Sequence, residues 1–256
     1  MLSINQIHHT YLTHTSANTV LEDISLLIEE GEFISFLGPS GCGKTTLLSI
    51  VAGLIEPTEG NVTIHNKPIK DVPTQIGYML QHDYLFPWKT IKENVLMGLK
   101  IMNKRSDEAE QKALALLRMM DLGDVEEMYP RQLSGGMRQR VALVRTLATN
   151  PSILLLDEPF SALDFQTKLK LEDLVSSTLK DFHKTALLVT HDIGESIAMS
   201  DRIFLFAPNP GRIANIFTVP EELRTISPLE VRQHHRYNEL FQDIWKELDS
   251  LGKNEY

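Results

Sequence analysis

The chain has 256 residues, 42% of them hydrophobic, and a formal net charge of −9. This suits one large domain or two small ones and disfavours nucleic-acid binding, which depends on clustered lysine and arginine. The single cysteine excludes an internal disulfide, and the first residues lack a secretion signal, so we expect a cytoplasmic chain. No apolar run approaches the eighteen or so residues that span a bilayer. Any role at a membrane would therefore need a partner that spans it.

The first segment, up to about Ile28, alternates apolar and polar residues in "LSINQIHH" (2–9) and "VLEDISLLI" (20–28), which predicts half-buried antiparallel strands. "GEFISFLG" (31–38) indicates a strand that enters a tight glycine turn, and "KTTLLSIVAGL" (44–54) has helical spacing. Two short strands are expected next, in "GNVTIHN" (60–66) and "QIGYML" (75–80).

The second half changes its pattern twice. Residues 91–149 are predicted to be mostly helical, and from 152 onward strands alternate with helices. Such alternation predicts an α/β fold with a mostly parallel sheet covered on both faces, and the helical stretch is then an inserted lobe of about residues 83–150. The expected elements are strands at 152–157, 185–190 and 202–206, and helices from about 166 to 182 and from 192.

The tail, residues 221–256, is predicted to be a C-terminal helical extension. Apolar side chains recur there at helical spacing, in Tyr237, Leu240, Phe241, Ile244, Trp245 and Leu248. The first interpretation is a last helix that packs this stripe on its own domain. A partner-binding helix is the alternative, and acidic residues along it disfavour an anionic membrane surface.

The motif "GPSGCGKT" (38–45) matches the phosphate-loop pattern G-x-x-x-x-G-K-[ST], with a strand before it and a helix after it. Backbone N–H groups would face phosphate oxygens, Lys44 would reach the β and γ phosphates, and the Thr45 hydroxyl would bind Mg²⁺. The alternative is a glycine turn with an incidental lysine, but it does not explain why a strand precedes the motif and a helix follows it. The predicted nucleotide-binding residues of the loop are Gly38, Pro39, Ser40, Gly41, Cys42 (as a small spacer), Gly43, Lys44, Thr45 and Thr46.

Acidic residues and a histidine follow two of the predicted strands. Asp157 and Glu158 come after a buried strand, where α/β sheets bind ligands. Asp157 can orient a Mg²⁺ shell and Glu158 can polarise an attacking water; the alternative for Glu158 is a loop acid that caps the next helix. His191, after the strand 185–190, can reach a γ phosphate, although a lone histidine there is more often structural.

The stretch "LSGGMRQR" (133–140) is typical of an anion cradle at a helix N-terminus, yet it lacks the lysine of the phosphate loop. Over about residues 2–220, the ordered motifs "GPSGCGKTT", Gln81, "LSGGM", "ILLLDE", "SALD" and "THD" resemble the ATP-binding subunits of ABC transporters. This resemblance implies a P-loop NTPase core in an ATPase domain of residues 1–220, with ATP and Mg²⁺ as cofactors.

The resemblance also implies individual roles. Ser134, Gly135 and Gly136 would bind the ATP held by a second copy of the chain, and Asp164 would bridge the two copies. Glu158, His191 and Lys44 would be catalytic, with His191 holding the γ phosphate. Thr45, Gln81 and Asp157 would contact Mg²⁺, and Gln81 would also touch the attacking water. Tyr11 would stack on adenine, unless it is simply an exposed strand residue. Met137 departs from the glutamine that is commoner at its position.

Two stretches look like the nitrate, sulfonate and taurine importer subunits: "QHDYLFPWKT" (81–90) and "APNPGRI" (207–213). Phe86 and Trp88 have an alternative, as core anchors of the helical lobe. The resemblance implies a homodimer at the cytoplasmic face of the cell membrane, with two integral membrane permease subunits and an extracytoplasmic solute-binding protein. An exporter motor or a regulatory ATPase is the alternative, and a nucleic-acid-associated ATPase, which carries a coiled-coil insertion or two fused units, fits less well.

Overall fold

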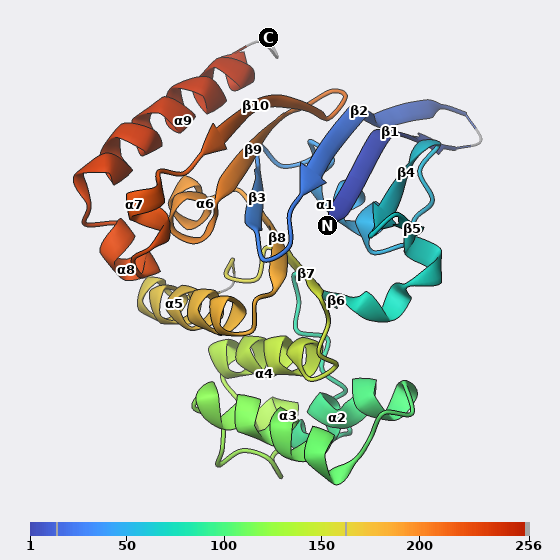
Figure 1. Cartoon of the computed structure of the whole chain (residues 1–256), viewed down its shortest axis with the longest axis vertical. Helices are drawn as coiled ribbons and strands as arrows, with labels where there is room; N and C mark the ends of the chain where they lie inside the picture. Colours follow the sequence, from blue (N-terminus) through green and yellow to red (C-terminus); the bar gives the residue numbers. More distant parts are fainter. Residues whose placement is uncertain (14, 162, 254–256) are drawn as a thin grey trace.

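A six-stranded sheet forms the centre of the molecule, and the computed structural model describes residues 1–13, 15–161 and 163–253 (Figure 1). All residues of three central strands are buried, as continuous apolar runs in a covered parallel sheet are: β3 (Phe33–Leu37), β8 (Thr185–Thr190) and β7 (Ile153–Asp157). Only the pair β10 and β9 is antiparallel in this described sheet, which confirms the predicted α/β fold. The strand order is β10 (Arg212–Thr218), β9 (Arg202–Ala207), β3 (Phe33–Leu37), β8 (Thr185–Thr190), β7 (Ile153–Asp157) and β6 (Ile76–Met79).

A second sheet is antiparallel and contains the N-terminal strands, which confirms the predicted antiparallel subdomain. Alternate residues of its long strands, such as Leu2, Ile4 and Ile28, are almost fully buried. They form one hydrophobic core with helix α1 (Lys44–Val51) and one face of the central sheet, so the start of α1 is held firmly. The strand order is β2 (Ala17–Ile28), β1 (Leu2–Leu12), β4 (Glu59–Ile64) and β5 (Lys67–Pro68).

Three helices occupy the stretch between the neighbouring parallel strands β6 and β7, and Figure 1 shows them gathered below the sheets: α2 (Ile91–Ile101), α3 (Asp107–Met119) and α4 (Gly135–Leu147). A hydroxyl side chain caps each N-terminus, from Thr90, Ser106 and Ser134. The helices bury their apolar faces in a core shared with the sheet. The expected helical insertion is present, while the domain bounds 1–220, 83–150 and 221–256 stay predictions.

Short 3₁₀ turns lie at Ile69–Asp71, Pro73–Gln75 and Pro130–Gln132.

The remaining helices follow the strands of the second half: α5 (Phe165–Asp181), α6 (Ile193–Met199), α7 (Glu221–Arg224), α8 (Pro228–Val231) and α9 (His235–Lys253). Figure 1 shows α6 to α9 on the side of the central sheet away from the N-terminal sheet. In the part of the chain that the structure describes, none of the helices combines the length and apolar character needed to cross a bilayer.

The last helix, α9, packs most of its predicted stripe against the domain. Ile244 is fully buried, and Tyr237, Leu240, Phe241 and Leu248 are partly buried against the core. Trp245, which we predicted in the same stripe, is 53% exposed and stacks on Phe241 with ring centroids 6.5 Å apart. The prediction for Trp245 is therefore wrong, because it lies at the edge of the stripe, on its solvent side.

Glu172 of α5 is an unusual carboxylate of this interior, fully buried and 2.6 Å from Nη2 of Arg232. Burial raises the pKa of Glu172 to about 7, against the opposing effect of Arg232. Between its unfolded pKa of 4.5 and 7, the folded state therefore holds a proton that the unfolded state has lost, so the group lowers stability as pH rises.

A Glu172→Gln variant should lose this pH dependence. Between about pH 5 and pH 8, we expect the free energy of unfolding of wild type to fall by about 3 kcal/mol relative to the variant. Urea unfolding of both proteins across this range measures the difference. Parallel pH profiles would show that Glu172 is already ionised at pH 5.

Candidate nucleotide site

The loop of residues 38–43 joins the carboxyl end of β3 to the first turn of α1. Two of its glycines are required by geometry. A Cβ on Gly38 would lie 2.7 Å from the carbonyl oxygen of Phe206, and Gly43 has φ of 92° with its Cβ position 2.6 Å from Leu21 Cδ2. Ser40 and Gly41 lie on the exposed side of the loop. The loop thus has the strand and helix on either side that a phosphate loop requires.

Lys44 starts α1 and is only 6% exposed. Its ammonium donates hydrogen bonds to the carbonyl oxygens of Gly38 and Pro39, both at 2.8 Å, and lies 3.4 Å from Cys42 Sγ. Burial raises the pKa of the Cys42 thiol although Lys44 is close, so this thiol stays protonated and unreactive. The loop therefore holds a buried cation by neutral groups alone, and it can offer that cation to an anion.

Asp157 ends β7 beside the start of α1. The Thr45 hydroxyl donates a hydrogen bond of 3.1 Å to its Oδ1, and the Tyr78 hydroxyl of β6 is 3.5 Å from its Oδ2. Burial raises the pKa of Asp157, against the hydrogen bond from Thr45, and burial also raises the pKa of Tyr78 to about 12. A desolvated carboxylate beside a hydroxyl is a donor set that suits a hard divalent cation. Tyr78, whose pattern marked only a strand, was not predicted here.

Glu158 lies between two other predicted site residues. Its Oε2 accepts a hydrogen bond of 3.1 Å from Gln81 Nε2, and its Oε1 is 3.4 Å from His191 Nδ1. The three side chains follow the neighbouring strands β7, β6 and β8, and the structure brings them together at one edge. Glu158 has φ of 46°, a conformation that costs about 1–3 kcal/mol for a residue with a side chain. A carboxylate held between an amide and an imidazole can accept a proton from water.

The alternative role of Glu158, as a cap of the next helix, is wrong. Asp164 caps α5 instead, because its Oδ1 accepts the N–H of Thr167 at 3.1 Å. This hydrogen bond lowers the pKa of Asp164, which keeps the cap ionised. Its predicted contact to a second chain is not tested by a single chain.

The second glycine stretch lies at the start of α4. Ser134 accepts the N–H of Met137 at 3.3 Å, and Ser134 and Gly135 are exposed. None of the hydrogen bonds among the described residues joins Ser134 to the phosphate loop. Tyr11, on β1, is 41% exposed and meets His9 edge to face at 4.5 Å. Ser134, Gly135 and Tyr11 thus face solvent, whereas Gly136 is half-buried, with its Cβ position 2.9 Å from Thr167 Cγ2 of α5.

Sequence reasoning missed the residues that hold Gln81 in place. Arg138 forms an ion pair of 2.9 Å with Asp83, and Arg145 donates to the carbonyl oxygens of Asp83 and Tyr84. Gln139 donates to the carbonyl oxygen of Gln81 at 3.3 Å. The available signal was the pair of arginines seven residues apart on α4, which shares one helix face. The helix that begins with the second glycine stretch therefore fixes the segment 81–84.

Phe86 and Trp88 are not core anchors. Trp88 is 70% exposed and Phe86 is 36% exposed, and their ring centroids lie 5.5 Å apart. The alternative that places them in the core of the helical lobe is wrong. They form an exposed aromatic pair five to seven residues from Gln81 in the sequence.

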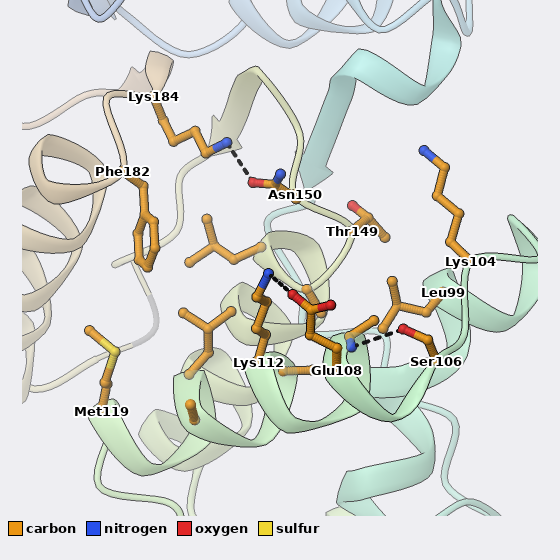
Figure 2. Close-up of a pocket in the computed structure, with 16 residues that line it drawn as sticks. Leu99, Lys104, Ser106, Glu108, Lys112, Met119, Thr149, Asn150, Phe182 and Lys184 are labelled. Carbon is orange, nitrogen blue, oxygen red and sulfur yellow. Dashed lines mark hydrogen bonds and ion pairs between the residues drawn. The ribbon is translucent and has the colours of Figure 1, made fainter.

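A cavity of about 680 Å³ lies away from the phosphate loop, between α3 and the turn that carries Phe182 and Lys184 (Figure 2). Figure 2 shows Lys184 reaching Asn150 at 2.8 Å and Lys112 paired with Glu108 at 2.7 Å. None of the residues predicted to bind nucleotide lines this cavity. The candidate site is instead the open edge of the sheet around Lys44 and Glu158.

Comparison with known proteins relates the whole chain to one family. Residues 21–161 match the family model described as ABC transporter. The chain is 60% identical over 254 residues to the uncharacterized ABC transporter ATP-binding protein YtlC of Bacillus subtilis (99% of this chain, 98% of the relative). It is 37% identical to the taurine import ATP-binding protein TauB of Ruegeria pomeroyi (99% and 98%) and 42% identical to the aliphatic sulfonates import ATP-binding protein SsuB of Bacillus licheniformis (78% and 78%).

A solved structure agrees with these relatives. The dimeric post-hydrolysis state of the ATP-binding cassette MJ0796, bound to ADP and Pi, has a TM-score of 0.77 and 34% identity, and covers 86% of this chain and 99% of that one. The similarity therefore extends over the phosphate loop, the cluster around Glu158 and the second glycine stretch. The chain belongs to the ABC transporter family, as one of its ATP-binding subunits that hydrolyse ATP.

Proposed function

We propose that this ATPase drives an importer of a small solute, of the nitrate, sulfonate or taurine kind. The main support for ATP hydrolysis at this site is that Gln81, Glu158 and His191 come together beside the phosphate loop. The relatives named for taurine and sulfonate import support the transport part. An exporter motor or a regulatory ATPase stays the alternative.

In this proposal the nucleotide phosphates lie on the loop 38–46. Lys44 exchanges the two loop carbonyls that it now contacts for phosphate oxygens, a small movement of a flexible side chain. The adenine stacks on the exposed ring of Tyr11. Cys42 and Pro39 act as spacers in the loop, and Ser40 and Thr46 add hydroxyl donors.

Mg²⁺ fits the oxygen donors on this edge of the sheet. Thr45 and Asp157 already adjoin each other, and Gln81 reaches the same edge. When bound, the ion would neutralise charge on the β and γ phosphates. Asp157 is suited to bind this ion, because a nearby cation would offset the cost of burying the ionised carboxylate.

Hydrolysis then depends on side chains of this chain. Glu158 accepts the proton of the attacking water, while Gln81 and His191, which contact its two oxygens, orient the water and the γ phosphate. The strained backbone of Glu158 fixes the carboxylate in place before the substrate arrives.

A second copy of the chain completes the site. Ser134 and Gly135 are exposed at the start of α4, followed by the half-buried Gly136, and the backbone N–H groups and positive end of this helix suit an anion held by another copy. Asp164, at the exposed start of α5, would contact that copy. We therefore propose a homodimer with two nucleotides at its interface.

The partners follow from the same proposal. Two integral membrane permease subunits would anchor the pair at the cytoplasmic face of the membrane, and the exposed Phe86 and Trp88, close to Gln81, would contact them. An extracytoplasmic binding protein would deliver the solute. No nucleic acid takes part.

The test is reconstitution of the chain with the permease pair and the binding protein with which it copurifies. We expect ATP hydrolysis to rise several-fold when the binding protein carries taurine, an alkanesulfonate or nitrate. If the chain hydrolyses ATP but none of these loaded binding proteins changes the rate, the importer branch is wrong, while the ATPase activity stands.

A further inference from the structure

Lys168 connects the start of α5 to the segment that follows β8 and carries His191. It lies one turn into α5, whose cap is Asp164, and its N–H is bonded to the Asp164 carbonyl oxygen at 2.9 Å. Its ammonium is 2.6 Å from Asp192 Oδ2 and 2.5 Å from Glu195 Oε1, both on the segment that follows β8. The side chain is 15% exposed and that of Glu195 only 4%. This is a largely buried cation shared by two carboxylates.

Both carboxylates fix the backbone around His191. Asp192 caps α6 by accepting the N–H of Glu195 at 3.1 Å. The Thr190 hydroxyl accepts the N–H of Asp192 at 3.0 Å and donates to the other oxygen of Glu195. The residues directly before and after His191 are thus both tied to the acids that Lys168 holds.

His191 itself has little else to hold it. Its side chain is 59% exposed, and its Nδ1 lies 3.4 Å from Glu158 Oε1. The position of the imidazole therefore depends on the backbone of residues 190–192. Although burial opposes it, contact with Asp192 and Glu195 raises the pKa of Lys168, so the cation that holds this segment stays charged.

The C-terminal extension supports the same cluster from the other side. Arg232 pairs with Glu172, one turn beyond Lys168 on α5. A Cβ on Gly194, in the first turn of α6, would lie 3.0 Å from the Tyr237 hydroxyl, so α9 presses closely on this turn. The first turn of α6, directly after His191, is therefore packed between α5 and the extension.

We propose that Lys168 is a positioning residue for ATP hydrolysis, which acts through Asp192 and Glu195 on the segment that carries His191. This inference rests on the proposed role of His191. Because Lys168 and Asp164 share the first turn of α5, a contact made by Asp164 with a second copy would be passed to His191. A displacement of about 1 Å in such a group can cost on the order of 100-fold in rate.

The test compares Lys168→Met, Lys168→Arg and the control Lys170→Met, an exposed lysine on the same helix. We expect Lys168→Met to lower kcat for ATP hydrolysis by about 10- to 100-fold with KM for ATP within about twofold. Lys168→Arg, which can contact both acids, should recover most of the rate, and Lys170→Met should match wild type. A wild-type kcat for Lys168→Met would overturn the proposal.

A double-mutant cycle with His191→Ala separates this role from a merely structural one. In the His191→Ala background, Lys168→Met should cause little further loss, because both changes remove the same positioned group. Losses that multiply would overturn the inference. If His191→Ala alone leaves kcat unchanged, the proposed role of His191 fails first, and that result is distinct. Should Lys168→Met not fold, as judged by its melting temperature, Asp192→Asn takes its place in the cycle.

Discussion

Replacing Glu158 with Gln is expected to lower kcat for ATP hydrolysis by about 10²–10⁴-fold, while the affinity for ATP changes little. Gln has the size of Glu and can still contact Gln81 and His191, whose atoms now lie 3.1 and 3.4 Å from the carboxylate oxygens. It cannot accept a proton from water. The loss therefore falls on the chemical step, and the phosphate loop around Lys44 is untouched.

Two measurements check this prediction: steady-state hydrolysis and the equilibrium binding of a fluorescent ATP analogue. Glu56→Gln is the matched control, because Glu56 is an exposed acid paired with Lys70 far from the site, and its loss should leave kcat unchanged. Near-normal hydrolysis by the Glu158 variant would remove Glu158 from the role of base. Loss of ATP binding would instead mean that the carboxylate holds the fold of the site.

The site residues that lie directly after a strand or at the start of a helix were predictable from the sequence. Glu158 comes after β7 and His191 after β8, and the structure places these two strands side by side. Gln81, just after the neighbouring β6, was expected only from the family resemblance. The carboxyl ends of neighbouring parallel strands meet at one edge, so residue types found far apart in the sequence could be expected to meet there. The phosphate loop was predictable for a simpler reason, since its residues are contiguous.

Contacts between distant segments were not predictable. The ties from Arg138, Gln139 and Arg145 to the segment 81–84 depend on how α4 packs, which no local pattern encodes. The ion pair between Lys168 and Asp192 was not predictable either, since charged residues on a helix are usually solvated.

Burial explains two differences between the predicted and the observed fold: strand β10 was not predicted, and the buried face of α9 was predicted too wide. Strand β10 is an edge strand, exposed or half-buried along its length, so its residues show little of the apolar alternation that marks a strand. Helical spacing also could not fix the width of the buried face of α9. Ile244 and Trp245 are neighbours in the sequence, yet one is fully buried and the other is 53% exposed.

Replacing Gly135 with Asp should strongly weaken ATP-driven pairing of the chain without harming its fold. Gly135 is the first residue of α4, and a Cβ there would meet only the tip of Arg138, at 4.0 Å. An acid in this position also suits the positive end of the helix dipole. The same carboxylate would occupy the proposed cradle for a partner's phosphates, and a like-charge contact costs several kcal/mol.

The measurement combines this change with Glu158→Gln, which lets bound ATP persist, and follows molecular mass by sedimentation with and without Mg²⁺ and ATP. The single variant should dimerise with ATP, and the double variant should dimerise at least about 100-fold more weakly while still binding ATP at its own phosphate loop. Gly252→Asp is the control, because its Cβ would meet nothing within 4 Å. A double variant that pairs as tightly as Glu158→Gln alone would show that the second glycine stretch does not hold a partner's nucleotide. The cradle without a lysine would then need another ligand, because Ser134 and Gly135 are exposed at the start of α4.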